Sequence, residues 1–593
     1  MRKTILFLLL AMTLASCNKQ HVHSLVFVQK NNPTCTEDGH EAYFLCSKCK
    51  RIFLDGEGQE ELTSIPIIKA TGHTYSDSYY FNNEAHWIQP LCDCGQKEEH
   101  PHDFNSNSVC NECGYNKFKP NLQPMEFLEH RIINEADFSK IDFDHRININ
   151  EESVVIDQPR TYYFQNSTID SISVVAENAT IIFDNVVLNH RIISNNVESI
   201  HLFLADNSVN VCNDALINFN GKVFIDGRGT LKAGKYGSDP VIKSKAIFIR
   251  NAALDIDKEG DVLWAHQYVY FDSVTANMKA TTIYVENNEA NKERYGLVDE
   301  DFVYKIVNDI SYGRGDYSSY APIHTAKGIF VEGDEGAYAE KDYLYNSQGV
   351  YIKDSTLHIS AGEDSIFSQF GYIDLNSSNI YSSSLSNGLR AKTFANLNKT
   401  TFQSTDGYEA IEAGQVQCID STIVANTFDD CIEASSNKDG YGNVIISSGN
   451  INVRSELDDG IDTTNIGRII NGAEVNAFGV GYGEGFDCDN GFIIDDGKAA
   501  AYSKYTTTEF LGISDSCIVE INCYPNYWES NKNLLLKQKD SDAVVFAQYI
   551  DFSMGNVVFS SNMISVGNTY SLYLDDDLIV EFLVTNKIII VEI

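Results

Sequence analysis

Acidic residues recur at the corners of a short repeating unit between residues 349 and 489 of this 593-residue chain. Carboxylates that are held close together repel one another unless they are protonated or share a cation, and calcium prefers carboxylate oxygens. The sequence therefore predicts a calcium site built from Asp429, Asp430, Glu433, Asp458, Asp459, Asp462, Glu484, Asp487 and Asp489. The alternative is that these acids are solvated corner residues whose Asp-Gly pairs only make turns.

Three tyrosines, Tyr408, Tyr441 and Tyr482, lie beside these acidic corners in the sequence. Aromatic faces stack on apolar faces of ligands, and sugar rings offer such faces. We therefore expect these tyrosines to contact carbohydrate.

A lyase would need a strong base, and the cations near the corners are Arg390, Lys392, Arg454 and Arg468. Each of them is typical of a surface salt-bridge residue. A glycosidase would need two facing carboxyl groups. In the pairs Asp429-Asp430 and Asp458-Asp459, however, adjacent residues of an extended segment point to opposite sides. No catalytic residue is predicted.

The spacing of the unit predicts how these residues are positioned. Turns at Asp354, Asn376, Asn398 and Asp420 follow one another at steps of 22 residues, and alternating apolar residues flank each turn. Alternation with period two marks strands with one buried face, and a fixed period built from short strands indicates a parallel β-solenoid. The predicted fold class is all-β, with about 22 residues per coil.

Equivalent residues of successive coils stack on one another in such a fold, about 4.8 Å apart. Two columns of acids then follow from the spacing. Asp430, Asp459 and Glu484 form one column, and Glu433, Asp462 and Asp487 form the other.

The coiling begins earlier in the chain, because turns at Asp184, Asp206, Arg228, Arg250 and Asp272 are also 22 residues apart. From Asp272 to Asp354 the step is 82 residues, which is one coil of 22 plus an excess of 60. We place this excess in an insertion at about 286–345, which either carries function or is a tolerated surface loop.

The formal net charge is −39, from 83 acidic and 44 basic residues. Nucleic acid is excluded as a partner, because phosphate binding needs clustered Lys and Arg. An acidic polysaccharide would also be repelled unless divalent cations bridge its carboxylates to those of the protein. We expect a monomer.

The amino terminus has a basic start, Arg2 and Lys3, followed by a short apolar run and then Leu14-Ala15-Ser16-Cys17. The start and the run predict a secretory signal. The last four residues resemble the bacterial lipobox, whose cysteine is diacylated, so Cys17 is the expected lipidation site and membrane anchor. The alternative is a plain signal peptide in which Cys17 is incidental.

Cysteine and histidine gather in residues 18–116, in two stretches that resemble a small repeat of bacterial surface proteins. Two CxxC pairs with nearby histidines have zinc-ribbon spacing, whereas export also permits disulfides. The predicted zinc ligands are Cys35, Cys46, Cys49 and His73 for one site and Cys92, Cys94, Cys110 and Cys113 for the other.

The expected domain order has six parts. They are a lipoprotein signal at 1–16, a zinc-ribbon-like repeat at 17–74, a second Cys/His-rich module at 75–116, a lead-in at 117–150, the solenoid at 151–500 and a β-rich cap at 501–593.

A family resemblance rests on the segments 176–186, 199–208 and 227–231 and on the Asp-Gly-Ile corners. These segments are similar to bacterial carbohydrate-binding-domain-containing β-helix proteins, relatives of the pectate-lyase-like superfamily. The resemblance implies a right-handed single-stranded parallel β-helix that binds acidic plant polysaccharide with calcium. This chain departs from the family pattern in its insertion and at Ser386-Asn387-Gly388, where the acid is lost.

Three functions are open at this point. The first is a cell-surface lipoprotein that binds polysaccharide without catalysis. The second is a pectate-lyase-like lyase or a glycoside hydrolase, and the third is an adhesin with a protein partner.

Overall fold

The chain divides into two compact units in the computed structural model, Met1–Gln123 and Pro124–Ile593. The structure describes residues 22–73, 75–81, 85–90, 98–103, 110–112, 132, 135–138, 141, 143, 146–149, 152–194, 197–234, 239–282, 284–286, 288–290, 292, 320–322, 326–335, 348–436, 442–505, 516–523, 526–539, 541 and 543–593. Among these residues, no helix has the length and apolar character needed to cross a bilayer.

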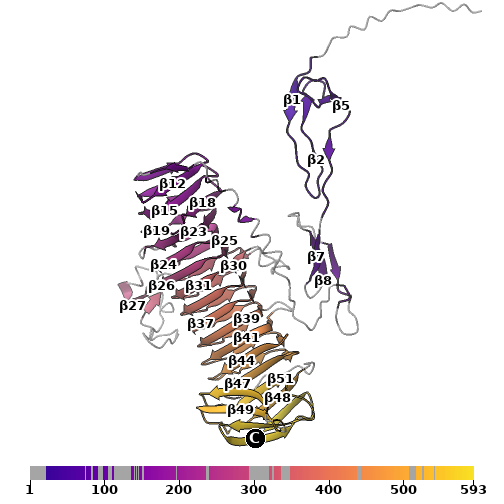
Figure 1. Cartoon of the computed structure of the whole chain (residues 1–593), viewed down its shortest axis with the longest axis vertical. Helices are drawn as coiled ribbons and strands as arrows, with labels where there is room; N and C mark the ends of the chain where they lie inside the picture. Colours follow the sequence, from indigo (N-terminus) through magenta and orange to yellow (C-terminus); the bar gives the residue numbers. More distant parts are fainter. Residues whose placement is uncertain are drawn as a thin grey trace, which may run out of the picture. The chain divides into compact units, whose positions relative to one another are not determined.

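The second unit is a parallel β-solenoid, as the sequence predicts (Figure 1). Ile373 pairs with Ala395 and Ala395 pairs with Val416, so equivalent residues are 22 and 21 positions apart. A complete coil contributes one strand to each of three parallel ladders. We name them A, B and C in chain order, so that a strand of ladder A is followed by a turn, then by a strand of ladder B and then by a strand of ladder C.

Ladder A precedes the turn of each coil. It consists of β10 (Arg146–Asn148), β12 (Thr161–Gln165), β15 (Thr180–Asp184), β18 (Ser199–Leu204), β21 (Lys222–Asp226), the second parts of β23 (Ile242–Arg250) and β25 (Leu263–Asp272), β30 (Gly349–Lys353), β33 (Tyr372–Asn376), β36 (Ala395–Asn398), the first parts of β39 (Val416–Thr427) and β41 (Val444–Ser455), β43 (Gly467–Ile470) and β46 (Phe492–Ile494).

Ladder B follows the turn. It consists of β13 (Thr168–Ile169), β16 (Val187–Leu188), β19 (Val209–Cys212), β22 (Thr230–Ala233), β24 (Ala253–Glu259), β26 (Thr275–Thr281), β31 (Thr356–Ala361), β34 (Asn379–Ser384), β37 (Thr401–Gly407), the second parts of β39 and β41, β44 (Ala473–Gly479) and β47 (Gly497–Ser503).

Ladder C completes the coil with the shortest strands. It consists of β11 (Ser153–Ile156), β14 (Ser171–Val174), β17 (Ile192–Ile193), β20 (Ile217–Asn218), the first parts of β23 and β25, β29 (Ile329–Val331), β32 (Ile366–Ser368), β35 (Leu389–Ala391), β38 (Ile411–Ala413), β40 (Ile432–Ala434), β42 (Ile461–Thr463) and β45 (Phe486–Cys488).

The turn between ladders A and B is held by a buried hydroxyl in several coils. Ser355, Ser378 and Ser421 each donate a hydrogen bond to the carbonyl two residues earlier, at 2.6, 2.7 and 2.8 Å. The preceding residue has a positive φ, as at Asp354 with φ 48° and Asp420 with φ 46°. Asp tolerates this left-handed conformation better than most residues, but in the coils of Asn376 and Asn398 the left-handed residues are Ser377 and Lys399, so the predicted turn positions there lie one residue too early.

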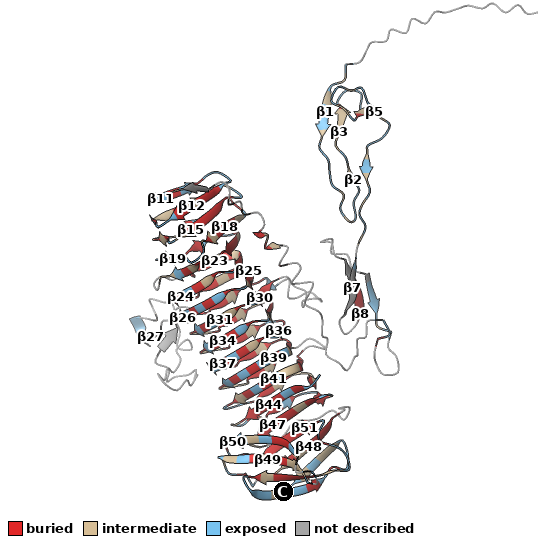
Figure 2. Cartoon of the chain, in the orientation of Figure 1, coloured by how far each residue is buried: buried red, intermediate tan, exposed pale blue. Residues whose placement is uncertain are grey.

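Apolar side chains from all three ladders fill the interior of the coil, and Figure 2 shows buried residues along every ladder. Strand β31 alternates between buried and exposed positions, with Leu357 and Ile359 inside and His358 outside. The inward residues of each coil pack on those of the next coil, so the core is continuous along the axis.

The parallel ladder ends at β47, where β51 (Asn556–Ser561) pairs antiparallel with it. Strand β51 also pairs with β48 (Cys517–Asn522), which pairs with β54 (Ile588–Glu592). Four further strands form an antiparallel sheet over this end, β49 (Lys532–Gln538), β50 (Val544–Ile550), β52 (Thr569–Leu574) and β53 (Asp577–Leu583). The change of direction covers the open edge of the last coil.

The predicted insertion at 286–345 is wrong in one respect. Strand β29, inside this range, pairs with β25 on one side and β32 on the other, so it is a regular strand of ladder C. Within the described residues before β29, strand β27 (Tyr284–Glu286) pairs antiparallel with β28 (Tyr320–Pro322), outside the three ladders. Strand β29 has only three residues, so its apolar run is too short to predict a strand from the sequence.

The first unit consists of small antiparallel sheets. One sheet contains β1 (Leu25–Val28), β3 (Tyr43–Cys46), β4 (Ile52–Phe53) and β5 (Glu61–Leu62). Strands β2 (Gly39–His40) and β6 (Ile67–Ile68) pair beside it. A further sheet contains β7 (Tyr75–Phe81), β8 (Ala85–Pro90) and β9 (Glu98–Pro101).

The solenoid core predicts a contrast between two neighbouring residues of β39. Ile423 is fully buried and Val424 is 44% exposed. We expect Ile423→Ala to lower the free energy of unfolding by about 2–5 kcal/mol, because it leaves a cavity in a stacked core. Val424→Ala should change it by less than about 0.5 kcal/mol. Urea denaturation followed by circular dichroism measures both, and equal effects would contradict the described register.

Candidate functional site

The strands of ladder C present one outward side chain per coil. In β32, β35, β38, β40 and β42 the first and third residues are buried and the middle residue is partly exposed. Strand pairing places these middle residues in one line, which we name the outer column. We apply this name to the line from the coil of Lys243 onward, where it contains Lys243, Trp264, Phe330, Phe367, Arg390, Glu412, Glu433, Asp462 and Asp487.

A second line of polar residues precedes these strands, two positions before each buried first residue. We name it the corner column, and it contains Asp364, Asn387, Glu409, Asp430, Asp459 and Glu484. The backbone amide of Asp459 donates to Asp430 Oδ1 at 2.8 Å, and the amide of Glu484 donates to Asp459 Oδ1. These bonds aim each carboxylate at the next coil. The two predicted columns of acids are therefore confirmed as spatial arrangements.

Burial changes the acidity of these columns. Loss of water raises the pKa of Glu409 and of Asp430 to about 9, and that of Asp459 to about 8. Burial also raises the pKa of Asp462 to about 7, and the neighbouring charges of Asp487 and Glu433 add to the effect. A carboxylate here costs free energy because it is both desolvated and surrounded by like charge.

A cation compensates these charges at one end only. Arg390 Nε lies 2.7 Å from Glu412 Oε2, and Asn387 donates to Glu412 and Glu409 at 2.6 and 3.2 Å. Within the described part of the chain, no salt bridge includes Asp429, Asp430, Glu433, Asp458, Asp459, Asp462, Asp487 or Asp489. These eight acids therefore form a cluster of carboxyl groups that has no salt bridge within the described part of the chain.

Three of these acids converge most closely. One carboxylate oxygen each from Asp430, Asp458 and Asp459 lies within 4.8 Å of the others. Burial raises the pKa of Asp458 as well, and the charges of Asp429 and Asp487 add to this shift. An all-oxygen donor set of this kind suits a hard divalent cation such as calcium.

The remaining predicted acids and tyrosines surround this group. Asp487 and Asp489 are exposed, and the charge of Asp489 contributes to the raised pKa of Asp462. Tyr408 is 37% exposed, and its hydrogen bond to Asp429 raises the pKa of the phenol. Tyr482 is 79% exposed and its ring is stacked with Tyr505 at 6.2 Å. Tyr441 lies outside the described residues.

The other end of the outer column is aromatic. Rings of Trp264 and Phe330 are 5.5 Å apart, and rings of Phe330 and Phe367 are stacked at 5.4 Å. Lys243 Nζ lies 3.4 Å from the Trp264 ring centroid, and the Arg390 guanidinium lies 5.4 Å from that of Phe367. The three rings are partly exposed, so the column offers an aromatic surface that continues into the acids.

Sequence reasoning missed Glu409, Glu412 and this aromatic stack. Glu409 and Glu412 stand two residues before and one after the buried Ile411, the same offsets as Asp430 and Glu433 around Ile432. Applying these offsets to every coil would have found both acids. The aromatic stack was hidden because 66 residues separate Trp264 from its partner Phe330.

A groove of about 510 Å³ opens on the outer face of ladder B. His358 and Tyr381 form part of its floor, with their rings stacked at 4.5 Å. Asp255, Asn277 and Gln403 also line it. The groove contains two acidic residues, Asp255 and Asp257, and is a second concave surface of the solenoid.

The structure groups the described cysteines with other histidines than the sequence predicts. Cys46 and Cys49 lie with His23, and Cys110 lies with His86 and His102. Among the described residues, neither group includes Cys35 or His73. The predicted residues Cys17, Cys92, Cys94 and Cys113 lie outside the described residues.

Comparison with known proteins leaves the chain without an assigned relative. No family model matches it, and no curated protein or solved structure matches it either.

The raised pKa values predict a pH dependence in the presence of chelator. Folding raises the pKa of Asp430 and Asp459 above the ordinary value of 3.8, so the folded state holds their protons more tightly than the unfolded chain does. Their stabilising contribution is complete below about pH 4 and is lost as the pH rises toward 9. The melting temperature should therefore fall between about pH 5 and 9.

Asp430→Asn should flatten this profile, because an amide does not titrate in this range. The variant should still fold, since the amide oxygen can accept the hydrogen bond from the Asp459 backbone amide. The control is Asp420→Asn, in an exposed turn, which should keep the wild-type slope. A metal-free protein whose stability is constant over this range would contradict the burial of the two columns.

Proposed function

We propose that the chain is an exported lipoprotein that binds acidic polysaccharide without catalysis, through calcium held on ladder C. One observation carries the proposal, the line of acids without a salt bridge among the described residues that runs from Glu433 to Asp487, within which burial raises the pKa of Asp462 to about 7. Such a cluster is costly by itself, and a bound cation offsets the cost.

The spacing of the ladder fits calcium. Oxygen ligands lie about 2.3–2.6 Å from the ion, so two ligands on opposite sides are about 5 Å apart. Neighbouring strands are about 4.8 Å apart, which is nearly the same distance. Acids of consecutive coils, such as Asp462 and Asp487, can therefore share one ion between them.

A polysaccharide that carries carboxylates would complete the coordination of such ions. The protein supplies a straight array with one outward residue per coil, and a polymer has the matching repeat in one direction. The aromatic end of the outer column, at Trp264, Phe330 and Phe367, would stack on the sugar faces of the same polymer. The net charge of −39 makes calcium necessary, because it excludes direct contact between anions.

The cations near the acids support binding rather than elimination. Arg390 is paired with Glu412, Arg454 with Glu456 and Asp551, and Arg468 with Asp495. A carboxylate partner stabilises the protonated guanidinium, and this opposes the proton abstraction that a lyase requires.

Calcium should stabilise the chain and connect it to polygalacturonate. By mass action, calcium at 100 times its dissociation constant raises the free energy of unfolding by about 2.7 kcal/mol. We therefore expect a higher melting temperature with calcium, and retention on a polygalacturonate column that chelator abolishes. The absence of both effects would refute the proposal.

The matched variants separate two surfaces. Asp459→Asn with Asp462→Asn removes charge from ladder C and keeps an oxygen that accepts the Glu484 amide. Asp255→Asn with Asp257→Asn removes the same charge from the groove on ladder B. Retention should be lost only in the first pair. Loss only in the second pair, or retention without calcium, would move the site to the groove, and release of unsaturated sugars would identify a lyase.

The lipid anchor has its own test. The lipobox-like sequence predicts that Cys17 carries the acyl chains, so Cys17→Ser should move the protein from the membrane fraction to the soluble fraction. Mass spectrometry of the mature amino terminus gives the second readout. A wild-type mature terminus that begins elsewhere, without acyl chains, would rule out the anchor.

A further inference from the structure

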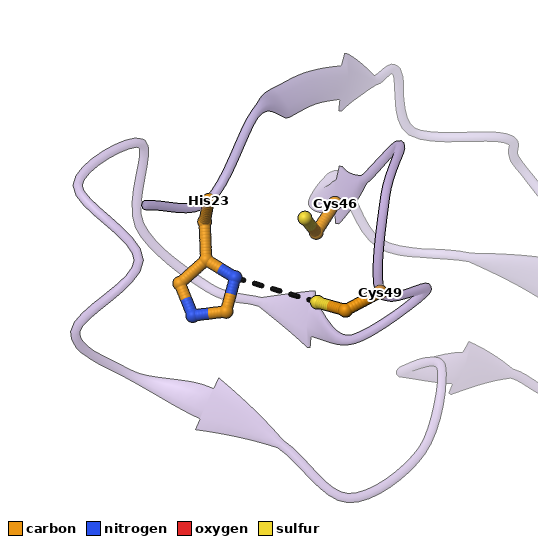
Figure 3. Close-up of side chains that lie close together, drawn as sticks. All are labelled: His23, Cys46 and Cys49. Atoms are coloured by element: carbon orange, nitrogen blue, oxygen red, sulfur yellow. Dashed lines mark hydrogen bonds between the residues drawn. The ribbon is translucent and has the colours of Figure 1, made fainter. Parts of the chain in front are cut away.

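His23, Cys46 and Cys49 meet at the base of a hairpin in the first unit (Figure 3). His23 precedes β1, Cys46 ends β3, and Cys49 lies in the turn between β3 and β4. The imidazole Nδ1 is 3.4 Å from the Cys49 sulfur, and all three donor atoms lie within 4.8 Å of one another. Figure 3 shows the two sulfur atoms and this nitrogen on the same side of the turn.

The turn that carries both cysteines is tightly closed. The Lys50 amide donates to the Cys46 carbonyl at 2.9 Å, and the Cys46 amide donates to the Arg51 carbonyl at 2.8 Å. Lys50 has a φ of 63°, in the left-handed region that favours glycine. In the second CxxC of the sequence the same position is Gly114. The second CxxC therefore has a glycine, which adopts this conformation without strain, at the position that corresponds to Lys50.

A similar group occurs in the second Cys/His-rich stretch. His86 is buried and its Nδ1 lies 3.7 Å from the Cys110 sulfur, while the His102 ring is 5.4 Å from the His86 ring. The other ring nitrogen of His86 is 2.9 Å from a carboxylate oxygen of Glu112. A carboxylate on the far nitrogen orients a histidine toward a metal and makes it a better ligand.

The first group lies in a module that has little core of its own. Within residues 22–73, the buried apolar side chains are Tyr43, Cys46 and Phe53. Large apolar side chains such as Phe27, Leu54 and Ile67 are more than half exposed. A domain of this size does not bury enough apolar surface to be stable, and a structural metal or disulfides commonly supply the difference.

We propose that the first unit holds two zinc ions, one on His23, Cys46 and Cys49 and one on His86, His102 and Cys110, and that the first ion stabilises the fold of residues 22–73. Zinc binds sulfur at about 2.3 Å and nitrogen at about 2.0 Å in tetrahedral geometry, which puts ligand atoms about 3.5 Å apart. The 3.4 Å between His23 and Cys49 matches this spacing. The soft donors select zinc, whereas the oxygen donors of ladder C suit calcium.

Metal analysis of the full chain tests the proposal. We expect about two zinc ions per chain after removal of loosely bound metal, one for each group. Replacement by cobalt should give thiolate-to-cobalt charge-transfer absorption in the wild-type protein, a readout that does not depend on any variant. A protein without tightly bound metal, or one in which Cys46 and Cys49 are joined in a disulfide, would overturn the proposal.

Variants distinguish the two possible ligand sets of the first site. His23→Ala with Cys49→Ser should lower the zinc content by one ion and make residues 22–73 sensitive to protease. Cys35→Ser with His73→Ala removes the same residue types outside the group and should keep both ions. Loss of zinc in the second pair but not in the first would refute the ligand assignment. Calcium-dependent retention on polygalacturonate is expected to be unchanged in either pair.

Discussion

The structure of the solenoid depends on the parallel pairing of equivalent residues in successive coils. This pairing forces like side chains onto like at about 4.8 Å. Apolar residues benefit from it, because each inward side chain packs against two similar ones and the core becomes continuous. Turn residues benefit as well, since Ser355 and Ser378 each accept a backbone hydrogen bond from the preceding coil.

Charged residues respond to the same constraint in the opposite way. A carboxylate stacked on a carboxylate is unfavourable, and burial removes the water that would screen the pair. Between Lys243 and Arg390, the outer column of ladder C avoids this with aromatic rings. In its second half it accumulates acids from Glu412 to Asp487. The column therefore changes from aromatic and basic residues to acids at the step from Arg390 to Glu412.

The two units differ in how much apolar surface stabilises them. The solenoid buries one long apolar core, and the free energy of that burial offsets the electrostatic cost of its buried acids. The first unit has few buried apolar residues, and its His/Cys groups lie where a core would otherwise be needed. The first unit thus groups sulfur and nitrogen donors, whereas the solenoid groups carboxylate oxygens.

The repeated pattern of turns, apolar anchors and acidic corners was enough to predict the parallel coil and the two columns of acids, although successive acids such as Glu433, Asp462 and Asp487 are 29 and 25 positions apart rather than 22. The pairing of Trp264 with Phe330 and the place of β29 could not be predicted, since these two residues are 66 positions apart and the repeat is interrupted between them. Which acids are buried, such as Glu409, and therefore which pKa values rise, depends on packing in the folded chain and could not be predicted from spacing. The tertiary structure also brought His23 rather than His73 to Cys46 and Cys49, because the order of antiparallel strands, not spacing along the chain, decides which histidine reaches the turn.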